Sequence, residues 1–192
     1  MTGVVLAGGR NSRMGRDKAA LPWQESDFLH VILQNLATIC DELIVVTNTE
    51  RSETLPAVRH VADIIPHCGP LSGIHAGLVH ASSEYAFVTA CDMPYFSAAA
   101  ANYIMAQSPG WDAAVPASTD FFEPLFACYA KSCIAAIESL LQSNNRKTQA
   151  LFPLLRCKHV PLDELKQFDP QLRLLRNINS PSEYRDALLE MR

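Results

Sequence analysis

A glycine- and arginine-rich segment near the start of the chain has the composition of a phosphate-binding loop. Leu6–Lys18 (LAGGRNSRMGRDK) contains three glycines and four cationic residues, and it directly follows a short apolar run. Glycine lets backbone N–H groups approach phosphate oxygens closely, while Arg13 can supply a forked pair of donors and Lys18 a point charge. The spacing matches neither a P-loop nor a dinucleotide-binding G-x-G-x-x-G. A solvated surface turn could have the same composition, but the position directly after the first predicted strand favours phosphate binding.

Asp92 is a candidate ligand for Mg²⁺. It follows the apolar run Tyr85–Ala90, and a hard cation commonly takes one or two carboxylates together with substrate phosphates. An Asx turn made with Pro94 is the alternative. The six histidines show no metal-binding spacing, and no G-x-S-x-G elbow supports a Ser/His/Asp hydrolase.

The elements that must position these residues alternate along the chain. Apolar runs of strand length alternate with helical patterns. The expected strands cover 2–7, 42–47, 85–90, 112–117 and 125–129, and the expected helices cover 28–39, 71–81, 97–107, 132–141 and 182–189. Because parallel neighbours need a crossover helix, this order predicts one Rossmann-like, three-layer α/β/α domain over residues 1–192, with a mostly parallel sheet. Ligands of such sheets bind beyond the carboxyl ends of the strands, here after Ala7, Thr47 and Ala90.

Composition and charge narrow the function classes. The 192 residues are 48% hydrophobic and 19% charged, which suits a chain that buries its own core, and the formal net charge is -4. A negative balance argues against a protein that coats nucleic acid. No apolar run approaches the roughly 20 residues of a membrane span, no basic leader precedes the first strand, and the six cysteines contain no C-x-x-C pair. We therefore expect a cytoplasmic protein with reduced thiols that binds neither nucleic acid nor membrane.

Four motifs together resemble those of the molybdenum cofactor guanylyltransferase family. Leu6–Lys18 is similar to the family's signature loop, with LAGG at its start and RMGRDK at its end. Gly69–Gly73 resembles the family's G-P-L-x-G, Cys91–Pro94 its C-D-x-P, and Asn177–Pro181 its N-x-N-T-P. Ser180 stands where the family usually has Thr, which keeps the hydroxyl. The resemblance spans nearly the whole chain and implies a nucleotidyltransferase fold.

This resemblance implies a reaction and a set of site residues. The reaction is transfer of GMP from GTP to molybdopterin with release of pyrophosphate and with Mg²⁺ as cofactor. Arg13, Lys18 and Asp92 would be catalytic, and Asp92 would hold the metal. The implied GTP contacts in the N-terminal part are Leu6, Ala7, Gly8, Gly9, Arg13, Lys18, Asn48, Asp63, Gly69, Pro70, Leu71, Gly73 and Asp92. The implied acceptor contacts in the C-terminal part are Arg146, Lys147, Asn177 and Asn179. Proteins that deliver the pterin or receive the product are further partners that this reaction allows.

Structural roles explain some of these residues without any ligand. Asp63 would pass for an ordinary loop acid, and Gly69–Gly73 would serve as a helix entry. Asn177 and Asn179 would serve as caps for the last helix. The register of the contact at Asn48 stays open, because threonines stand on both sides of it.

Three other functions compete with GMP transfer. A cytidylyltransferase for the same pterin and a sugar-phosphate nucleotidyltransferase share the arginine and the lysine, but they typically carry another residue at the second glycine, so the Gly8-Gly9 pair favours guanine. A catalytically silent nucleotide-binding protein is the alternative from another class. It is disfavoured because Arg13, Lys18 and Asp92 are all present.

Overall fold

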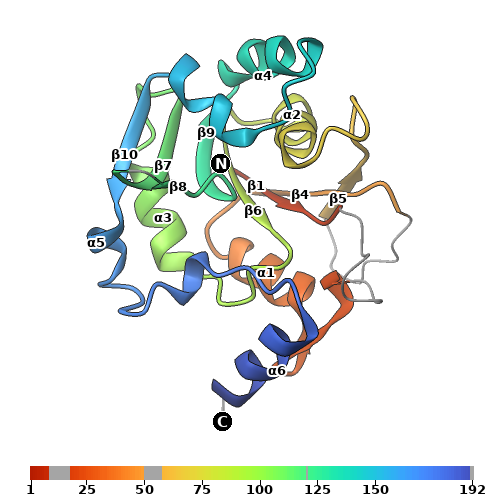
Figure 1. Ribbon diagram of the computed structural model, residues 1–192, viewed down its shortest axis with the longest axis vertical. Helices are drawn as coiled ribbons and strands as arrows, with labels where there is room; N and C mark the ends of the chain where they lie inside the picture. The colour runs from red at the N-terminus through yellow and green to blue at the C-terminus, as the bar shows by residue number, and fades with distance from the viewer. Residues whose placement is uncertain (9–17, 50–57, 120, 191–192) are drawn as a thin grey trace.

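The computed structural model describes residues 1–8, 18–49, 58–119 and 121–190. Its central sheet has the strand order β10-β7-β9-β6-β1-β4-β5, with β8 paired to the end of β7 (Figure 1). The strands are β1 (Thr2–Leu6), β4 (Glu42–Val46), β5 (Val58–Val61), β6 (Tyr85–Ala90), β7 (Ala113–Ser118), β8 (Phe121–Phe122), β9 (Phe126–Ala130) and β10 (Cys157–Pro161).

The directions of the strands define one functional edge. β1 lies between β4 and β6 and is parallel to both, and β5 and β10 are parallel to their neighbours β4 and β7. β9 is antiparallel to β6 and to β7, so two reversals return β7 to the direction of β6. The expected mostly parallel sheet is confirmed. As a result β1, β4, β6 and β7 all end at the same edge, called the carboxyl edge below, and β9 begins there.

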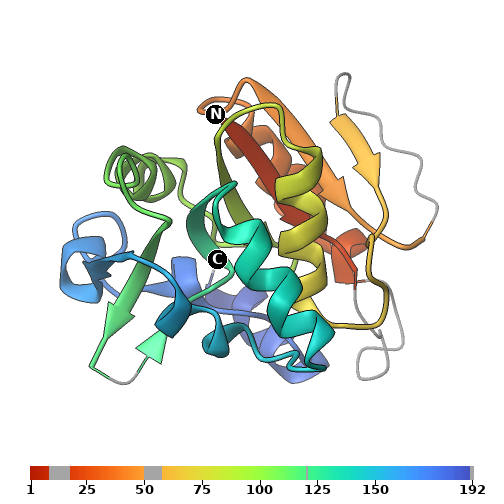
Figure 2. The ribbon, with the colours of Figure 1, turned by 90° about the horizontal axis from the view of Figure 1, so that it is seen from above.

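Helices cover both faces of the sheet, which confirms the three-layer architecture. α1 (Phe28–Leu36) and α3 (Ala98–Ala106) pack on the face that includes Val5, and α2 (Pro70–His80) and α4 (Cys133–Gln142) pack on the face that includes Val4 and Leu6. Successive side chains of a strand point to opposite faces, so the apolar run of β1 supplies both cores. Figure 2 shows α2 and α4 side by side on the same face of the sheet.

Two glycines bring α2 close to the central strand. A Cβ atom at Gly77 would lie 2.6 Å from Val4 Cγ1, and one at Gly73 would lie 3.0 Å from Leu6 Cδ2. A side chain at Gly77 would therefore force the helix and strand apart. Gly73, the second glycine of the G-P-L-x-G motif, has a packing role of the same kind against Leu6.

The C-terminal part of the chain packs against the start of the domain. A third apolar cluster joins Trp23, Phe28, Val31, Ile178 and Ala187. The elements involved are the hairpin of β2 (Pro22–Trp23) and β3 (Ser26–Asp27) and the helix α6 (Pro181–Glu190). The remaining short elements are α5 (Leu162–Leu165) and the 3-10 helices η1 (Lys18–Ala20), η2 (Thr148–Ala150), η3 (Phe152–Leu154) and η4 (Arg173–Leu175). In the part of the chain that the structure describes, no helix has the length and apolar character needed to cross a membrane.

Candidate active site

Three polar side chains from distant parts of the chain meet at the carboxyl edge. The ammonium nitrogen of Lys18 donates to Asp92 Oδ2 at 3.0 Å and to Asn179 Oδ1 at 2.6 Å. The Lys18 and Asp92 side chains are only 19% and 18% exposed, so this ion pair is partly shielded from water. Two of the three predicted catalytic residues are thereby in direct contact. The third, Arg13, lies outside the described residues.

The sheet positions Asp92, and Asp92 in turn positions the C-terminal segment. The backbone N–H of Cys91 donates to Leu6 O at 3.0 Å, so β1 and β6 stay paired up to the point where Asp92 emerges. The N–H of the fully buried Ile178 donates to Asp92 O at 2.8 Å. This bond holds the segment that carries Asn179 beside the carboxyl end of β6.

A capping box leaves the Asn179 side chain available to Lys18. Glu183 Oε2 accepts hydrogen bonds from the backbone N–H groups of Asn179 at 2.6 Å and Ser180 at 2.9 Å, and Ser180 Oγ accepts from the Glu183 N–H at 3.2 Å. These are the reciprocal bonds of an S-x-x-E helix start. The N–H of Asn179 and the other donors hold the pKa of Glu183 below its usual value. The interpretation of Asn177 and Asn179 as caps is wrong, because Ser180 and Glu183 cap α6.

The arrangement around the Lys18 ammonium suits a hard cation. A carboxylate oxygen and an amide oxygen approach one positive charge from two sides, and both are oxygen ligands of the kind that Mg²⁺ prefers. Among the described residues no three His, Cys, Asp or Glu side chains gather as a metal site. A divalent ion here would therefore rely on Asp92, Asn179, water and substrate phosphate oxygens.

Asn48 and Asp63 form a second polar pair at the same edge. Asn48 Nδ2 donates to Asp63 Oδ2 at 2.8 Å, and the Asp63 N–H donates to Asn48 Oδ1 at 3.0 Å. Thr47 and Thr49 instead turn toward each other, with their hydroxyl oxygens 3.0 Å apart. The structure thus brings together two predicted GTP contacts that follow β4 and β5, and Asn48 is the residue of the three that faces Asp63.

The remaining predicted GTP contacts differ in their exposure to solvent. Leu71 is fully buried, and Leu6 and Ala7 are 8% and 7% exposed, so the side chains at these positions offer a nucleotide almost no surface. Gly69 and Pro70 at the start of α2 are exposed. Gly69 has φ +69 with open space where a Cβ would stand, which makes glycine the residue that this turn requires. Gly8 is exposed after β1, and Gly9 lies outside the described residues.

The four predicted acceptor contacts do not form one cluster. Arg146 Nη1 donates to His67 O at 3.0 Å, which places it beside the loop that leads into α2. Lys147 is exposed next to it, and its N–H donates to Asn145 Oδ1 at 3.2 Å. Asn179 instead contacts Lys18, and Asn177 holds a buried Oδ1 atom with no hydrogen-bond partner among the described residues.

Glu123 is a buried acid that the sequence analysis missed. It is 7% exposed and lies in the turn between β8 and β9, at the edge where Asp92 also lies. Burial raises the pKa of Glu123 to about 7; the Leu125 N–H, 3.1 Å from Oε1, acts against this, and the negative charge of Asp92 adds to it. A charged residue inside the apolar stretch from Phe121 to Phe126 was the signal that could have drawn attention to it.

Comparison with known proteins assigns the family. The family model of the MobA-like NTP transferase domain matches residues 3–159, which include Lys18, Asp92 and the Asn48–Asp63 pair. The chain belongs to the MobA-like NTP transferase family. The family is thus one of nucleotidyltransferases, and the matched region ends before the segment that contributes Asn179.

Relatives of the MobA-like family extend the similarity to almost the whole chain. A probable molybdenum cofactor guanylyltransferase of Pelotomaculum thermopropionicum is 38% identical over 95% of this chain and 89% of its own length. A protein of Peptoclostridium acidaminophilum with the same description is 34% identical over 95% of this chain and 86% of its own. The crystal structure of molybdopterin-guanine dinucleotide biosynthesis protein A from Archaeoglobus fulgidus aligns over 100% of both chains, with a TM-score of 0.85 and 26% identity.

Proposed function

We propose that this protein is a molybdenum cofactor guanylyltransferase, which transfers GMP from GTP to the terminal phosphate of molybdopterin and releases pyrophosphate. The observation that carries the proposal is the contact of Lys18 with Asp92 and Asn179 at the carboxyl edge of a MobA-like fold. The names of the relatives support the choice of substrates.

The reaction depends more on positioning the two substrates and neutralising phosphate charge than on proton transfer. An oxygen of the acceptor phosphate attacks the α-phosphorus of GTP, a new P–O bond forms, and the bond to the bridging oxygen of the β-phosphate breaks. The attacking phosphate is already ionised at neutral pH, so no general base is needed. Lys18 would neutralise charge that develops on the phosphates, and Arg13 would assist it.

Mg²⁺, when bound, would supply positive charge that polarises the substrate phosphates. Asp92 is the proposed ligand from β6, and Asn179 adds an amide oxygen from the segment before α6. Lys18 contacts both of these side chains, so its ammonium would neutralise phosphate charge directly beside the proposed ligands.

The two substrates would approach from different sides of this cluster. The Asn48–Asp63 pair and the exposed start of α2 lie on the proposed GTP side, where backbone N–H groups at a helix N-terminus favour phosphate. The segment of Asn177 and Asn179 lies on the proposed acceptor side. Arg146 donates to His67 O in the loop before α2, and this contact supports a proposed role for Arg146 on the GTP side. The preference for guanine rests on the Gly8-Gly9 pair.

The decisive experiment measures pyrophosphate release from each of the four nucleoside triphosphates, with and without molybdopterin, in buffer containing Mg²⁺. We expect release with GTP only when molybdopterin is present, and formation of the guanine dinucleotide. A higher kcat/KM for CTP would assign the cytidylyl reaction instead. Nucleotide binding without any release of pyrophosphate would make the protein a silent binder.

A pair of variants tests the role given to Asp92. Asp92→Asn keeps the size of the side chain but removes its charge, and we expect turnover to fall by about a hundredfold or more with the fold intact. Asp163→Asn is the matched control, because the exposed carboxylate of Asp163 in α5 also forms an ion pair with a lysine, Lys166. Equal activity of the two variants at saturating Mg²⁺ would overturn the assignment.

A further inference from the structure

The loop that carries Asp92 is attached to the C-terminal segment of the chain at two places. At the first, the N–H of Ile178 donates to Asp92 O at 2.8 Å. This bond lies one residue before Asn179, whose side chain contacts Lys18. A single hydrogen bond fixes the distance between two segments but lets them turn about it. A second attachment is needed to fix their relative direction.

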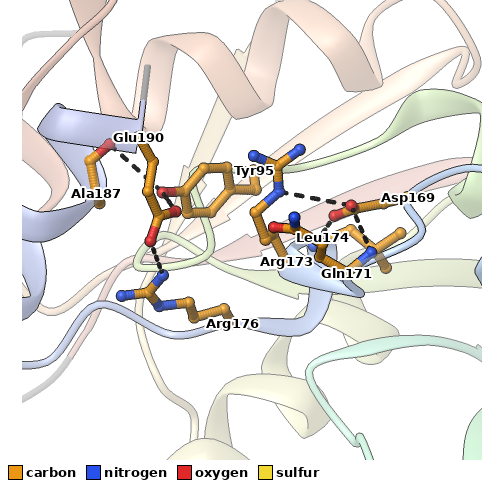
Figure 3. Close-up of polar contacts among 8 residues, drawn as sticks. All are labelled: Tyr95, Asp169, Gln171, Arg173, Leu174, Arg176, Ala187 and Glu190. Atoms are coloured by element: carbon orange, nitrogen blue, oxygen red, sulfur yellow. Dashed lines mark hydrogen bonds and ion pairs between the residues drawn. The ribbon is translucent and has the colours of Figure 1, made fainter. Parts of the chain in front are cut away.

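Glu190, at the end of α6, makes the second attachment. Its Oε2 accepts from Tyr95 Oη at 2.7 Å, and its Oε1 accepts from Arg176 Nη1 at 2.8 Å (Figure 3). Tyr95 follows Asp92 in the same loop, and Arg176 precedes Ile178 in the same segment. This pair of contacts, called the Glu190 bridge below, therefore joins the loop and the segment at a point away from their backbone bond.

Hydrogen bonds also hold the backbone that leads to Arg176. Asp169 Oδ1 accepts from the Gln171 N–H at 3.2 Å, and Asp169 Oδ2 accepts from the Leu174 N–H at 3.0 Å (Figure 3). The Arg176 N–H donates to Arg173 O at 2.8 Å. On this side the Glu190 bridge therefore starts from a backbone that is already held in place.

The charge states of the Glu190 bridge keep its donors and its acceptor constant at neutral pH. The bond from Arg176 first, and then the bond from Tyr95, holds the pKa of Glu190 below its usual value, so this side chain is an ionised acceptor. Burial, and then the bond to Glu190, raises the pKa of Tyr95 to about 12, so its hydroxyl keeps the proton that it donates. Charge-assisted bonds of this kind are stronger and more directional than bonds between neutral groups.

The exposure of the Glu190 bridge argues against a role in overall stability. The Arg176 and Glu190 side chains are 33% and 37% exposed, and exposed ion pairs contribute little to the free energy of unfolding. Rates are more sensitive to geometry, because a misplacement of about 1 Å can lower a rate by about a hundredfold. A contact that adds little to stability can therefore still affect a reaction at the site that it orients.

We propose, on the basis of the proposed function, that the Glu190 bridge positions the Asn179 side chain beside Asp92 and Lys18 for nucleotidyl transfer. The members of the bridge are positioning residues, because they act through Asn179 and not on the substrates: Tyr95, Arg176 and Glu190. Without the bridge the segment turns about its backbone bond to the loop, and the Asn179 amide oxygen leaves the Lys18 ammonium.

Kinetics of two variants and of their combination test this role. Arg176→Met keeps the aliphatic stem and removes the donors, and we expect kcat for pyrophosphate release to fall by about tenfold. The KM for GTP should stay within about twofold of wild type and the melting temperature within about 2 °C. Asn179→Ala should also lower kcat, and adding Arg176→Met to it should change kcat by less than about twofold. An equal loss from Arg176→Met in both backgrounds would overturn the proposal.

Matched controls separate the Glu190 bridge from the loss of a charge or a hydroxyl elsewhere. Arg185→Met removes an exposed arginine of α6. Tyr103→Phe removes a hydroxyl that donates to Glu164 Oε2 at 2.6 Å between α3 and α5. Both should keep kcat within about twofold of wild type, whereas Tyr95→Phe should lower kcat by roughly three- to tenfold. A kcat of Arg176→Met equal to that of Arg185→Met would contradict the positioning role.

Amide hydrogen exchange tests the Glu190 bridge without the reaction. In Arg176→Met the Ile178 N–H should exchange about tenfold faster than in wild type, because its bond to the loop opens more often. The Ala130 N–H, which donates to Asp112 O at 2.8 Å, should exchange at an unchanged rate. A wild type that releases no pyrophosphate but shows this pattern refutes the proposed reaction and not the bridge. Unchanged exchange at Ile178, or equal acceleration of both amides, refutes the bridge whatever the reaction is.

Discussion

Replacing Glu123 by Gln should stabilise the protein, and the gain should grow with pH. Burial raises the pKa of this carboxyl to about 7 from its ordinary value of 4.5. The folded protein therefore binds a proton at Glu123 in a pH range where the unfolded chain has lost it. The stability associated with that proton is fully present below about pH 4.5 and is lost as the pH rises to 7 and above.

The size of the change in stability follows from the size of the pKa shift of Glu123. One pKa unit corresponds to about 1.4 kcal/mol, so a rise from 4.5 to about 7 gives a loss of about 3 kcal/mol in the wild type between about pH 4 and pH 8. Glu123→Gln removes the ionisation and keeps an oxygen that can accept from the Leu125 N–H, which now bonds to Oε1. The difference in unfolding free energy between the variant and the wild type should therefore widen by about that amount.

Urea unfolding of both proteins at several pH values measures this difference directly, because contributions shared by the two proteins cancel. Glu25→Gln, in the exposed turn between β2 and β3, reports what the loss of one surface charge does by itself. A stability difference between Glu123→Gln and the wild type that is the same at pH 4 and pH 8 would refute the reasoning.

Three further outcomes follow from the geometry. Lys18→Met should lower kcat by about a hundredfold or more and leave the melting temperature almost unchanged, since a lost cation at developing phosphate charge acts on the rate; a large thermal shift with normal kcat would make Lys18 structural. Asn48→Ala should raise KM for GTP by roughly tenfold with little change in kcat, because it removes the partner that orients Asp63; initial-rate kinetics with unchanged KM would argue against a nucleotide contact. Gly77→Ala should cost about 1–3 kcal/mol in urea unfolding, because its Cβ would stand 2.6 Å from Val4 Cγ1; unchanged stability would contradict the close approach of α2 to β1.

Local patterns were sufficient to predict most of the architecture. The run Thr2–Leu6 is mostly apolar, which is typical of a strand buried on both faces, and helical spacing places α1 and α2 close to where they lie. α1 ends at Leu36, before the expected end at Ile39. The strand β10 and the antiparallel direction of β9 were not predicted, because pairing partners depend on contacts between segments far apart in the chain.

The sequence by itself was sufficient to name two reactive groups of the site, Lys18 and Asp92. The tertiary structure decided which other side chains lie beside them. Lys18 and Asp92 stand out because glycine-rich turns and strand ends are local features with a known place at the edge of a parallel sheet. The contact of Asn179 with Lys18 across the chain, and the burial of Glu123 at the same edge, depend on the two antiparallel steps around β9 and on the bond from Ile178 to Asp92. Long-range pairings of this kind decide which side chains share an environment, and with it their charges and pKa values. No local pattern carries that information, because the interacting residues are brought together only when the whole sheet has formed.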